Sequence, residues 1–531
     1  MGVFEYVWAG VLAVFLGPEA FSLFGIGVPI TLVMVVFGFL LGIVIGATPG
    51  LGGPFVMAVS LPILISFFGF TPDALLPVMG FLVGVMKGAT VGGAVPAILF
   101  NTPGTPDALM TTLDGYPMTK RGNAGKALRT AHFASVSGDT FSDLVLFTTA
   151  PFLAIIVESY LGFAEKAALI VLSLSFVAAV VGASPMKGLM AAFFGILLAS
   201  VGTGEDLYPR MTMGTEFLAN GFPLITAVLG VLIMGEVITS FEETWRDRRA
   251  ARVQNQIPQS DDNSLSWSER KALLPYISVS AAVGTLIGAL PGIGSTLAAT
   301  LGYATGQKMH KGPVKFGDGT PEGVAATEAA NSSVSGANLI PVLSLGIPGN
   351  VSAVFLILAA ESIGGFNPGP SVFRFTTSEV NPELVIAFGL FTTMMCANIL
   401  NWTIGGQFMR WVGVMSKVPK QVLMPMVFLL TITAVYVQET SFDAIFFLLG
   451  FGLLGFFMRK LRVPILPFVI AFILASNLET ALRQAFAVSG GDPFFLFRSP
   501  ISIVFLVLSV VVIVFFMCGK KDEAALSSEV S

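Results

Sequence analysis

Long apolar runs that are almost free of charge alternate with short polar segments along most of the chain. Most of these runs are close to the roughly 20 residues that a helix needs to cross a bilayer. Clear examples are residues 23–46, 142–162, 164–183, 221–239, 382–403, 421–437, 442–457 and 499–517. The pattern predicts an all-α polytopic membrane protein with about 10–14 membrane segments.

The composition of the chain agrees with a lipid bilayer as its surroundings. Apolar residues make up 54% of the 531 positions, charged residues make up 11%, and glycine occurs 58 times. Soluble domains are far less apolar than this. The net charge is −4 and the basic residues lie in loops, so we expect no nucleic-acid partner. Cys396 and Cys518 lie in or beside apolar runs, and we expect neither a disulfide nor a zinc site.

One polar segment divides the chain into two halves. It begins with four arginines close behind a membrane run, and basic residues beside a membrane end favour the cytoplasmic side. These arginines are Arg246, Arg248, Arg249 and Arg252. The predicted organisation is a first membrane repeat (1–241), a cytoplasmic linker (242–271), a second membrane repeat (272–518) and a polar C-terminal tail (519–531).

Two short motifs occur once in each half, in the same order. The segment "GATPGLG" at 46–52 matches "GALPGIG" at 288–294, at an offset of 242 residues. The segment "PAILFNTPG" at 96–104 matches "PVLSLGIPG" at 341–349, at an offset of 245 residues. Two matches at nearly constant offset predict an internal duplication, so each half carries the same scaffold.

Loop charges indicate how the two repeats are oriented. The loop 205–216 is mainly acidic, whereas its counterpart 458–462 is basic. The same contrast separates Glu158, Glu165 and Lys166 in the first half from Arg410, Lys417 and Lys420 in the second. Because basic loops favour the cytoplasmic side, these pairs predict an inverted-topology repeat. The loops 120–129 and 308–315 are basic in both halves, and we expect 308–315 to face outward, where positive charge attracts anions.

Each motif interrupts an apolar run with Pro-Gly, which predicts non-helical backbone at membrane depth. Unpaired backbone groups cost several kcal/mol each in lipid, so such breaks persist only where protein or a polar cavity satisfies them. A helix-start signal follows each break, at Gly53-Pro54, Thr105-Pro106, Ser295 and Asn350, since these residue types are favoured there. A helix that begins inside the membrane directs unpaired N–H groups and partial positive charge at its ligand. Four converging helix N-termini therefore predict an anion site.

The predicted substrate-binding residues are those of the breaks, with the flanking side chains that can form hydrogen bonds. They are Thr48, Pro49, Gly50, Asn101, Thr102, Pro103, Gly104, Thr105, Pro291, Gly292, Gly294, Ser295, Thr296, Ser344, Pro348, Gly349 and Asn350. The unwound carbonyls at the same place are suitable ligands for a coupling Na⁺ ion. The alternative, that these prolines and glycines are kinks with a packing role, stays open.

Four segments resemble the large membrane subunit of the tripartite tricarboxylate transporters, the TctA family: "GATPGLGG", "NTPGTPDALMTTLDGYPMTKRGNAGKAL", "GALPGIGSTLAA" and "SLGIPGN". The resemblance extends over about 20–480 and implies a multi-pass subunit of the bacterial inner membrane. Such a subunit works with a small membrane subunit and a periplasmic solute-binding protein. It implies import of di- or tricarboxylates, or related organic anions, by alternating access with Na⁺ or H⁺ as the coupling ion.

The resemblance also places the family's two pairs of Pro-Gly loops on this chain. They fall on Thr48-Pro49-Gly50, Asn101-Thr102-Pro103-Gly104, Pro291-Gly292-Ile293-Gly294-Ser295 and Ile347-Pro348-Gly349-Asn350. The first repeat has Thr48 where the second has Leu290. This difference makes the pocket asymmetric, as a single bound substrate requires.

Several further polar residues interrupt the apolar pattern. Lys87 is either a functional intramembrane lysine or one that extends to the membrane interface. Glu322 and Glu328 lie in "TPEGVAATEAANSSVSGAN", and each is either a ligand of the coupling cation or part of a solvated loop, which we favour. Asp107 and Asp114 follow the second break, and Asp107 lies near a helix start, where a carboxylate is favourable.

Other classes of protein remain as alternatives. We expect no enzyme, because the chain has no H-E-x-x-H motif and no paired catalytic residues within its apolar runs. An anion channel also uses broken helices but does not need four helix starts at one site. A non-transporting membrane scaffold predicts no substrate flux at all. The sequence leaves open which carboxylate is carried and whether the chain forms a homo-oligomer.

Overall fold

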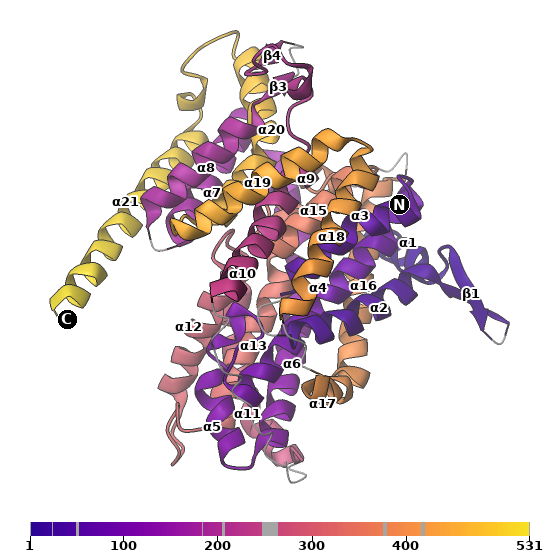
Figure 1. Ribbon diagram of the computed structural model, residues 1–531, viewed down its shortest axis with the longest axis vertical. Helices are drawn as coiled ribbons and strands as arrows, with labels where there is room; N and C mark the ends of the chain where they lie inside the picture. Colours follow the sequence, from indigo (N-terminus) through magenta and orange to yellow (C-terminus); the bar gives the residue numbers. More distant parts are fainter. Residues whose placement is uncertain are drawn as a thin grey trace. The chain divides into compact units, whose positions relative to one another are not determined.

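The protein is almost entirely helical (Figure 1). The computed structural model describes residues 2–23, 25–48, 52–182, 184–203, 208–246, 264–374, 380–415 and 420–529. Within these ranges, nine helices are long and apolar enough to cross a bilayer, and six shorter apolar helices have 10–17 residues. The predicted all-α polytopic membrane fold is therefore confirmed. The predicted number of about 10–14 membrane segments lies between the nine long helices and the total of the nine long and six shorter helices.

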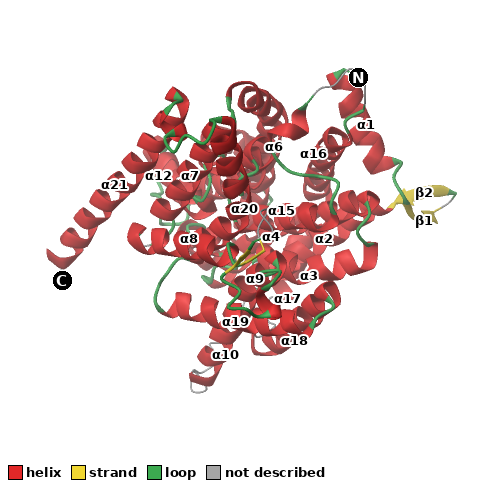
Figure 2. Ribbon diagram, turned by 90° about the horizontal axis from the view of Figure 1, so that it is seen from above, coloured by secondary structure: helices red, strands yellow, loops and turns green. Residues whose placement is uncertain are grey.

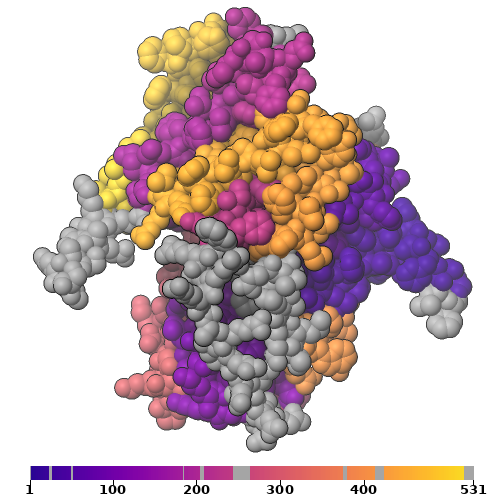
Figure 3. All heavy atoms as spheres, in the orientation of Figure 1, coloured from indigo at the N-terminus to yellow at the C-terminus, as the bar shows by residue number. Residues whose placement is uncertain are grey.

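Two short β-hairpins, which the sequence did not predict, are the strands found in the described residues (Figure 2). The strand β1 (Glu19–Leu23) pairs antiparallel with β2 (Ile26–Pro29), and β3 (Gly202–Thr203) pairs antiparallel with β4 (Pro209–Arg210). The apolar run 23–46 therefore begins in a hairpin and becomes helical only after β2. Figure 3 shows the surface of the first hairpin in indigo.

The chain folds into two compact units, and each unit combines segments from both halves of the sequence. Unit 1 contains Met1–Ile155 and Arg249–Pro419, and unit 2 contains Ile156–Arg248 and Lys420–Ser531. Each predicted repeat therefore contributes to both units. The repeat boundaries predicted from the sequence stay a prediction, and the central part of the expected linker, residues 247–263, lies outside the described residues.

Unit 1 contains the four Pro-Gly breaks. Its first-half elements are α1 (Val3–Phe15), β1, β2, α2 (Ile30–Gly46), α3 (Gly53–Phe68), α4 (Pro72–Phe100), η1 (Pro106–Leu109), α5 (Thr112–Lys120) and most of α6 (Ala124–Tyr160). Its second-half elements are α11 (Trp267–Gly288), α12 (Gly294–Met309), α13 (Pro321–Ala337), α14 (Leu339–Leu345), α15 (Val351–Ile363), η4 (Pro370–Phe373), α16 (Pro382–Leu400), η5 (Asn401–Gly405) and α17 (Gly406–Met415).

Unit 2 contains the remaining helices of each half. From the first half these are α7 (Phe163–Val180), α8 (Pro185–Ala199), β3, β4, η2 (Glu216–Leu218), α9 (Leu224–Leu229), η3 (Gly230–Met234) and α10 (Gly235–Arg246). From the second half they are α18 (Lys420–Glu439), α19 (Phe442–Lys460), α20 (Ile465–Val488), η6 (Phe495–Phe497) and α21 (Pro500–Glu529).

The packing of unit 1 repeats between the halves. In the first half α2 packs along α4, and in the second α11 packs along α13. Glycines make the first contact close: a Cβ atom on Gly38 would lie 2.2 Å from the Phe81 carbonyl oxygen, and one on Gly88 would lie 2.1 Å from that of Phe39. In the second half, a Cβ on Gly284 would lie 2.2 Å from the carbonyl oxygen of Ala330. Small residues that bring backbones together are typical of membrane helix pairs.

In unit 2, helices from one half of the sequence pack on helices from the other half. The last long helix of the second half, α20, packs on α7 and α8 of the first, and α10 of the first half packs on α18 and α19 of the second. The two equivalent loops of this unit lie at opposite ends of α8. Lys187, in the first turn of α8, donates to the carbonyl oxygen of Leu461, whereas β3 follows directly after the end of α8. At 1.5 Å per residue, α8 is about 22 Å long.

Candidate functional site

The second and fourth breaks have the same backbone geometry. The helices before them end at residues with left-handed conformation, Asn101 with φ 55° and Gly346 with φ 73°. In each repeat the N–H of the next residue then bonds back to a proline carbonyl oxygen, Pro96 or Pro341, at 3.2 Å. Asn and Gly are the residues that tolerate this conformation at a helix end. The duplication seen in the sequence is thus repeated in the hydrogen bonds of the breaks, and Asn101 serves there to end a helix.

Breaks of the same repeat contact each other. Gly292 of the third break donates its N–H to the carbonyl oxygen of Gly349 of the fourth break at 2.9 Å. In the first repeat, Gly104 lies so close to Gly46, at the end of α2, that a Cβ atom would be 2.2 Å from the Gly46 oxygen. The helices α3 and α15, which follow the first and fourth breaks, also pack together. The structure therefore brings the described parts of the four breaks into one region of unit 1.

A carboxylate of the chain links the two repeats at this region. The hydroxyl of Thr296, in the first turn of α12, donates to Asp107 Oδ1 at 2.9 Å, and the Ser295 side chain also bonds to Asp107. The start of α12 thus contacts a carboxyl group, which is the functional group of the ligand predicted there. The helix predicted to start at Thr105 is not an α-helix in the structure. A 3₁₀ turn of four residues, η1, follows Thr105, and the α-helix α5 begins only at Thr112.

Three predicted side chains bond within their own helix or cap. The Thr48 hydroxyl donates to the carbonyl oxygen of Val44 at 3.0 Å, and that of Ser344 donates to its own helix. Asn350 is the N-cap of α15, where its Oδ1 accepts from an N–H at 2.9 Å, as the helix-start signal predicts. Pro49 and Gly50 lie outside the described residues.

The remaining predicted residues lie in the breaks as expected from the sequence. They are Thr102, Pro103, Thr105, Pro291, Gly294 and Pro348. The helix after the third break begins at Gly294, one residue before the predicted start at Ser295.

The polar stretch after the third break is a buried helix, so the interpretation as a solvated loop is wrong. Residues 323–337 of α13 are all buried. Glu328 is fully buried and accepts a hydrogen bond from Thr111. Two asparagines of this region, Asn331 and Asn338, are also buried, and neither side-chain amide has a hydrogen-bond partner within the described residues. The helix is packed on both sides, which hydropathy alone does not reveal.

Asn338 is a candidate site residue that the sequence reasoning missed. It is at the C-cap of α13, and a Cβ atom on Gly349 would lie 3.0 Å from the Asn338 Cβ atom. A buried amide without a partner costs about 1–3 kcal/mol, and its place beside a Pro-Gly break makes Asn338 a candidate ligand-binding residue. In the sequence, Asn338 stands at the end of the polar stretch and corresponds to Gly93 of the first repeat at the offset of 245 residues. This position was the available signal.

Asp114 has a structural task instead. Its Oδ1 accepts the N–H groups of Gly319 and Thr320, each at 2.8 Å, and its Oδ2 accepts from the Tyr303 hydroxyl at 2.9 Å. The first repeat thereby holds the start of α13 in the second repeat. With these donors in place, Asp114 is satisfied without a ligand.

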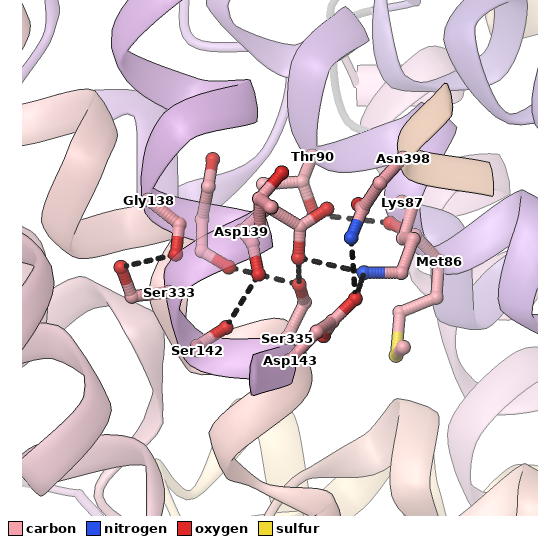
Figure 4. A network of polar contacts seen from close by, with 12 residues as sticks. Met86, Lys87, Thr90, Gly138, Asp139, Ser142, Asp143, Ser333, Ser335 and Asn398 are labelled. Atoms are coloured by element: carbon pink, nitrogen blue, oxygen red, sulfur yellow. Dashed lines mark hydrogen bonds and ion pairs between the residues drawn. The ribbon is translucent and has the colours of Figure 1, made fainter. Parts of the chain in front are cut away.

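Lys87 is fully buried, so the interpretation as a lysine that extends to the membrane interface is wrong. Its ammonium group contacts the carboxylates of Asp139 and Asp143 on α6 (Figure 4). Neither carboxylate was predicted from the sequence. Their spacing of four residues, which places them on one face of a helix, was the available signal.

Two cavities lie away from the breaks, one in each unit. The cavity in unit 1 has a volume of about 130 Å³ and is lined by Arg129, His132, Arg270, Trp402 and Arg410, among others. The cavity in unit 2 has a volume of about 630 Å³, and its lining includes Arg210, Glu479 and Arg483. Neither contains a residue predicted to bind substrate.

Comparison with known families now adds to this geometry. Residues 32–470 match the model of the "Tripartite tricarboxylate transporter TctA family". The chain belongs to the TctA family. It is therefore a multi-pass membrane subunit of a tripartite tricarboxylate transporter, a system with further subunits and a binding protein.

Two curated relatives of this TctA-family chain come from Agrobacterium vitis. The "Uncharacterized 52.8 kDa protein in TAR-I ttuC' 3'region" is 31% identical over 508 residues, which cover 93% of this chain and 95% of that protein. The "Uncharacterized protein in TAR-II ttuC' 3'region" is 30% identical over 249 residues, covering 45% of this chain and 98% of that protein. No solved structure matches the chain.

Proposed function

We propose that this TctA-family subunit imports organic carboxylates across the inner membrane of a bacterium. A periplasmic solute-binding protein delivers the substrate, and a small membrane subunit completes the transporter. The substrate binds where the four Pro-Gly breaks assemble in unit 1. The observation that carries the proposal is the carboxylate of Asp107, which bonds to the first turn of α12.

The contact between Asp107 and α12 is a model for substrate recognition. A helix N-terminus stabilises an anion through unpaired N–H groups and the helix dipole. Thr296 adds a hydroxyl donor at 2.9 Å. A di- or tricarboxylate has the same functional group as Asp107, with further carboxylates for the other breaks. Asn338, buried beside Gly349, supplies an amide that has no partner in the described residues.

Alternating access follows from inverted repeats around such a site. The packing of unit 2 supports the inversion, because the equivalent loops 205–216 and 458–462 are associated with opposite ends of α8. Two copies of one scaffold with opposite orientation can exchange conformations and so open the site to each side in turn. A gradient of Na⁺ or H⁺ drives accumulation in this proposal.

The test is uptake by vesicles that contain both membrane subunits, supplied with the cognate binding protein. A panel of radiolabelled mono-, di- and tricarboxylates is offered with an inward Na⁺ gradient, an inward H⁺ gradient, or neither. We expect accumulation of one carboxylate class above its external concentration, only with a gradient and the binding protein. Flux that stops at equal concentrations indicates a channel, and no flux indicates a scaffold; either result contradicts the proposal.

A further inference from the structure

A buried group of three charges lies between α4 and α6 of unit 1 (Figure 4). Lys87 Nζ donates to Asp139 Oδ1 at 2.8 Å and to Asp143 Oδ2 at 2.7 Å. The lysine side chain is 0% exposed, and the two aspartate side chains are 4% and 2% exposed. We refer to Lys87, Asp139 and Asp143 as the charged triad.

The triad has one more negative than positive charge when all three groups are ionised. An uncompensated charge in a buried site costs several kcal/mol. Asp143 Oδ2 accepts from Lys87 and also from Asn398 Nδ2 at 2.7 Å. Asp143 Oδ1 has no hydrogen-bond partner in the described part of the chain. One bound monovalent cation both removes the excess charge and satisfies this oxygen.

The neighbouring helices contribute neutral groups to the triad. Ser335 of α13 donates its hydroxyl to Asp139 Oδ1, and Asn398 of α16 donates to Asp143. Eight other ionisable side chains described on α4, α6, α13 and α16 form no hydrogen bond or ion pair with the triad. They are Asp73, Lys126, His132, Tyr160, Glu322, Glu328, Glu383 and Cys396. The excess negative charge is therefore not balanced by these described neighbours.

The corresponding position of the predicted second repeat carries no charge. At the offset of 245 residues, the position of Lys87 on α4 corresponds to Ser332 on α13. Ser332 is buried and forms a hydrogen bond with Ser135 on α6. A neutral residue thus occupies the equivalent place in the second repeat. A buried charge within a membrane segment is a candidate for a functional role, and its absence from the second predicted repeat agrees with such a role.

We propose that the charged triad binds one proton on Asp143 and that this proton couples to carboxylate movement. The coupling rests on the proposed import function, whereas proton binding by the triad does not. The proton comes from water on one side of the membrane, forms an O–H bond at Asp143 Oδ1, and leaves as that bond breaks toward the other side. Asn398 Oδ1 has no partner in the described residues and belongs to the amide that donates to Asp143 Oδ2, so it is an acceptor of suitable chemistry.

The donor atoms favour a proton over a metal ion. Hard cations such as Ca²⁺ and Mg²⁺ take about six or more oxygen ligands, and a metal site at the triad would need a comparable set. The unpartnered buried oxygens of Asp143 and Asn398 supply two in the described residues. The ammonium group of Lys87 also lies 2.7 Å from the same carboxylate and repels a metal cation. A proton needs one oxygen and one acceptor.

The experiment compares the parent with Asp143→Asn, and uses Asp73→Asn on the exposed start of α4 as the control. Vesicles with the complete transporter are assayed for accumulation driven by a pH gradient and for exchange of carboxylate at equal pH. We expect the ratio of accumulation to exchange to fall about tenfold or more in Asp143→Asn and to stay unchanged in the control. An unchanged ratio in Asp143→Asn overturns the inference.

A second measurement keeps the inference separate from the import function. Infrared difference spectra between high and low pH are recorded on purified parent and Asp143→Asn protein. We expect a carboxylic-acid carbonyl band in the parent that is lost in the variant, and a variant that is at least as heat-stable as the parent because its triad is neutral. The other carboxylates of the chain titrate in both proteins, so the band is sought in the parent spectrum after subtraction of the variant spectrum. If the parent carries no substrate but the subtracted spectrum contains the band, the import function and the coupling fail while proton binding stands. A subtracted spectrum without the band, or a variant that does not fold, overturns the inference.

Discussion

For single residues of the site, the sequence predicts which ones end or begin helices, but it does not predict which residues contact each other across helices. Residues that end or begin helices, such as Asn101 and Asn350, have recognisable chemistry and were placed correctly at the breaks. Partners such as Asp139 and Asp143 for Lys87 were not predicted. Their contact depends on how α4 packs on α6, and no local pattern in one helix specifies which residue of another it meets.

Asn338 gives a prediction with opposite effects on stability and binding. Replacement by leucine, which has the same branching and the same number of heavy side-chain atoms, removes an amide without a partner in the described residues, and such an amide costs about 1–3 kcal/mol. We therefore expect Asn338→Leu to unfold in detergent at no lower temperature than the parent. Carboxylate binding should weaken about tenfold, since one hydrogen bond to a charged group is lost. Thermal unfolding and equilibrium binding are the two measurements; a variant that is less stable and binds normally contradicts a ligand role.

Elements were predicted well where apolar length decided them and poorly where packing did. The run 164–183 is close to α7, and the run 442–457 is close to α19. The helix α13 was mistaken for a solvated loop because its residues are polar, small and uncharged for most of its length. Its surroundings are protein on all sides, so hydroxyl and amide groups replace the apolar surface that lipid would require.

The close contact of α2 with α4 gives a prediction at the scale of elements. A Cβ atom on Gly38 would lie 2.2 Å from the Phe81 carbonyl oxygen, so the two backbones must separate if it is present. We expect Gly38→Ala to lower stability in detergent by about 1–3 kcal/mol, as overpacking does. The matched control is Gly450→Ala on α19, where a Cβ atom would meet nothing within 4 Å. Equal unfolding temperatures for both variants would show that the glycine stripe is not a tight contact.

At the scale of the whole molecule, the sequence predicts a duplication but not how the two halves combine. Two motifs at offsets of 242 and 245 residues carry that prediction. The exchange of α10 and α20 between the halves within unit 2 was not foreseen. It depends on contacts between segments more than 170 residues apart, which a single sequence does not specify.

Inverted topology is tested by labelling from each side of the membrane. Single cysteines replace Met213 and Leu461, both exposed residues, in a chain whose Cys396 and Cys518 are changed to serine. We expect a membrane-impermeant maleimide to reach Met213→Cys from one side of sealed vesicles and Leu461→Cys from the other, because equivalent loops of inverted repeats face opposite sides. Labelling of both from the same side excludes the inversion.

The central claim, that the four breaks form one carboxylate site, is tested most directly by substrate protection. In the same cysteine-free background, Thr102→Cys probes the second break and Leu290→Cys the third, and both positions are exposed in the structure. The carboxylate class found by the uptake assay should slow maleimide labelling at both positions, while Met213→Cys in the 205–216 loop reacts at an unchanged rate. Labelling of Thr102→Cys and Leu290→Cys at the same rate with and without substrate, in vesicles that take up that substrate, would contradict the account.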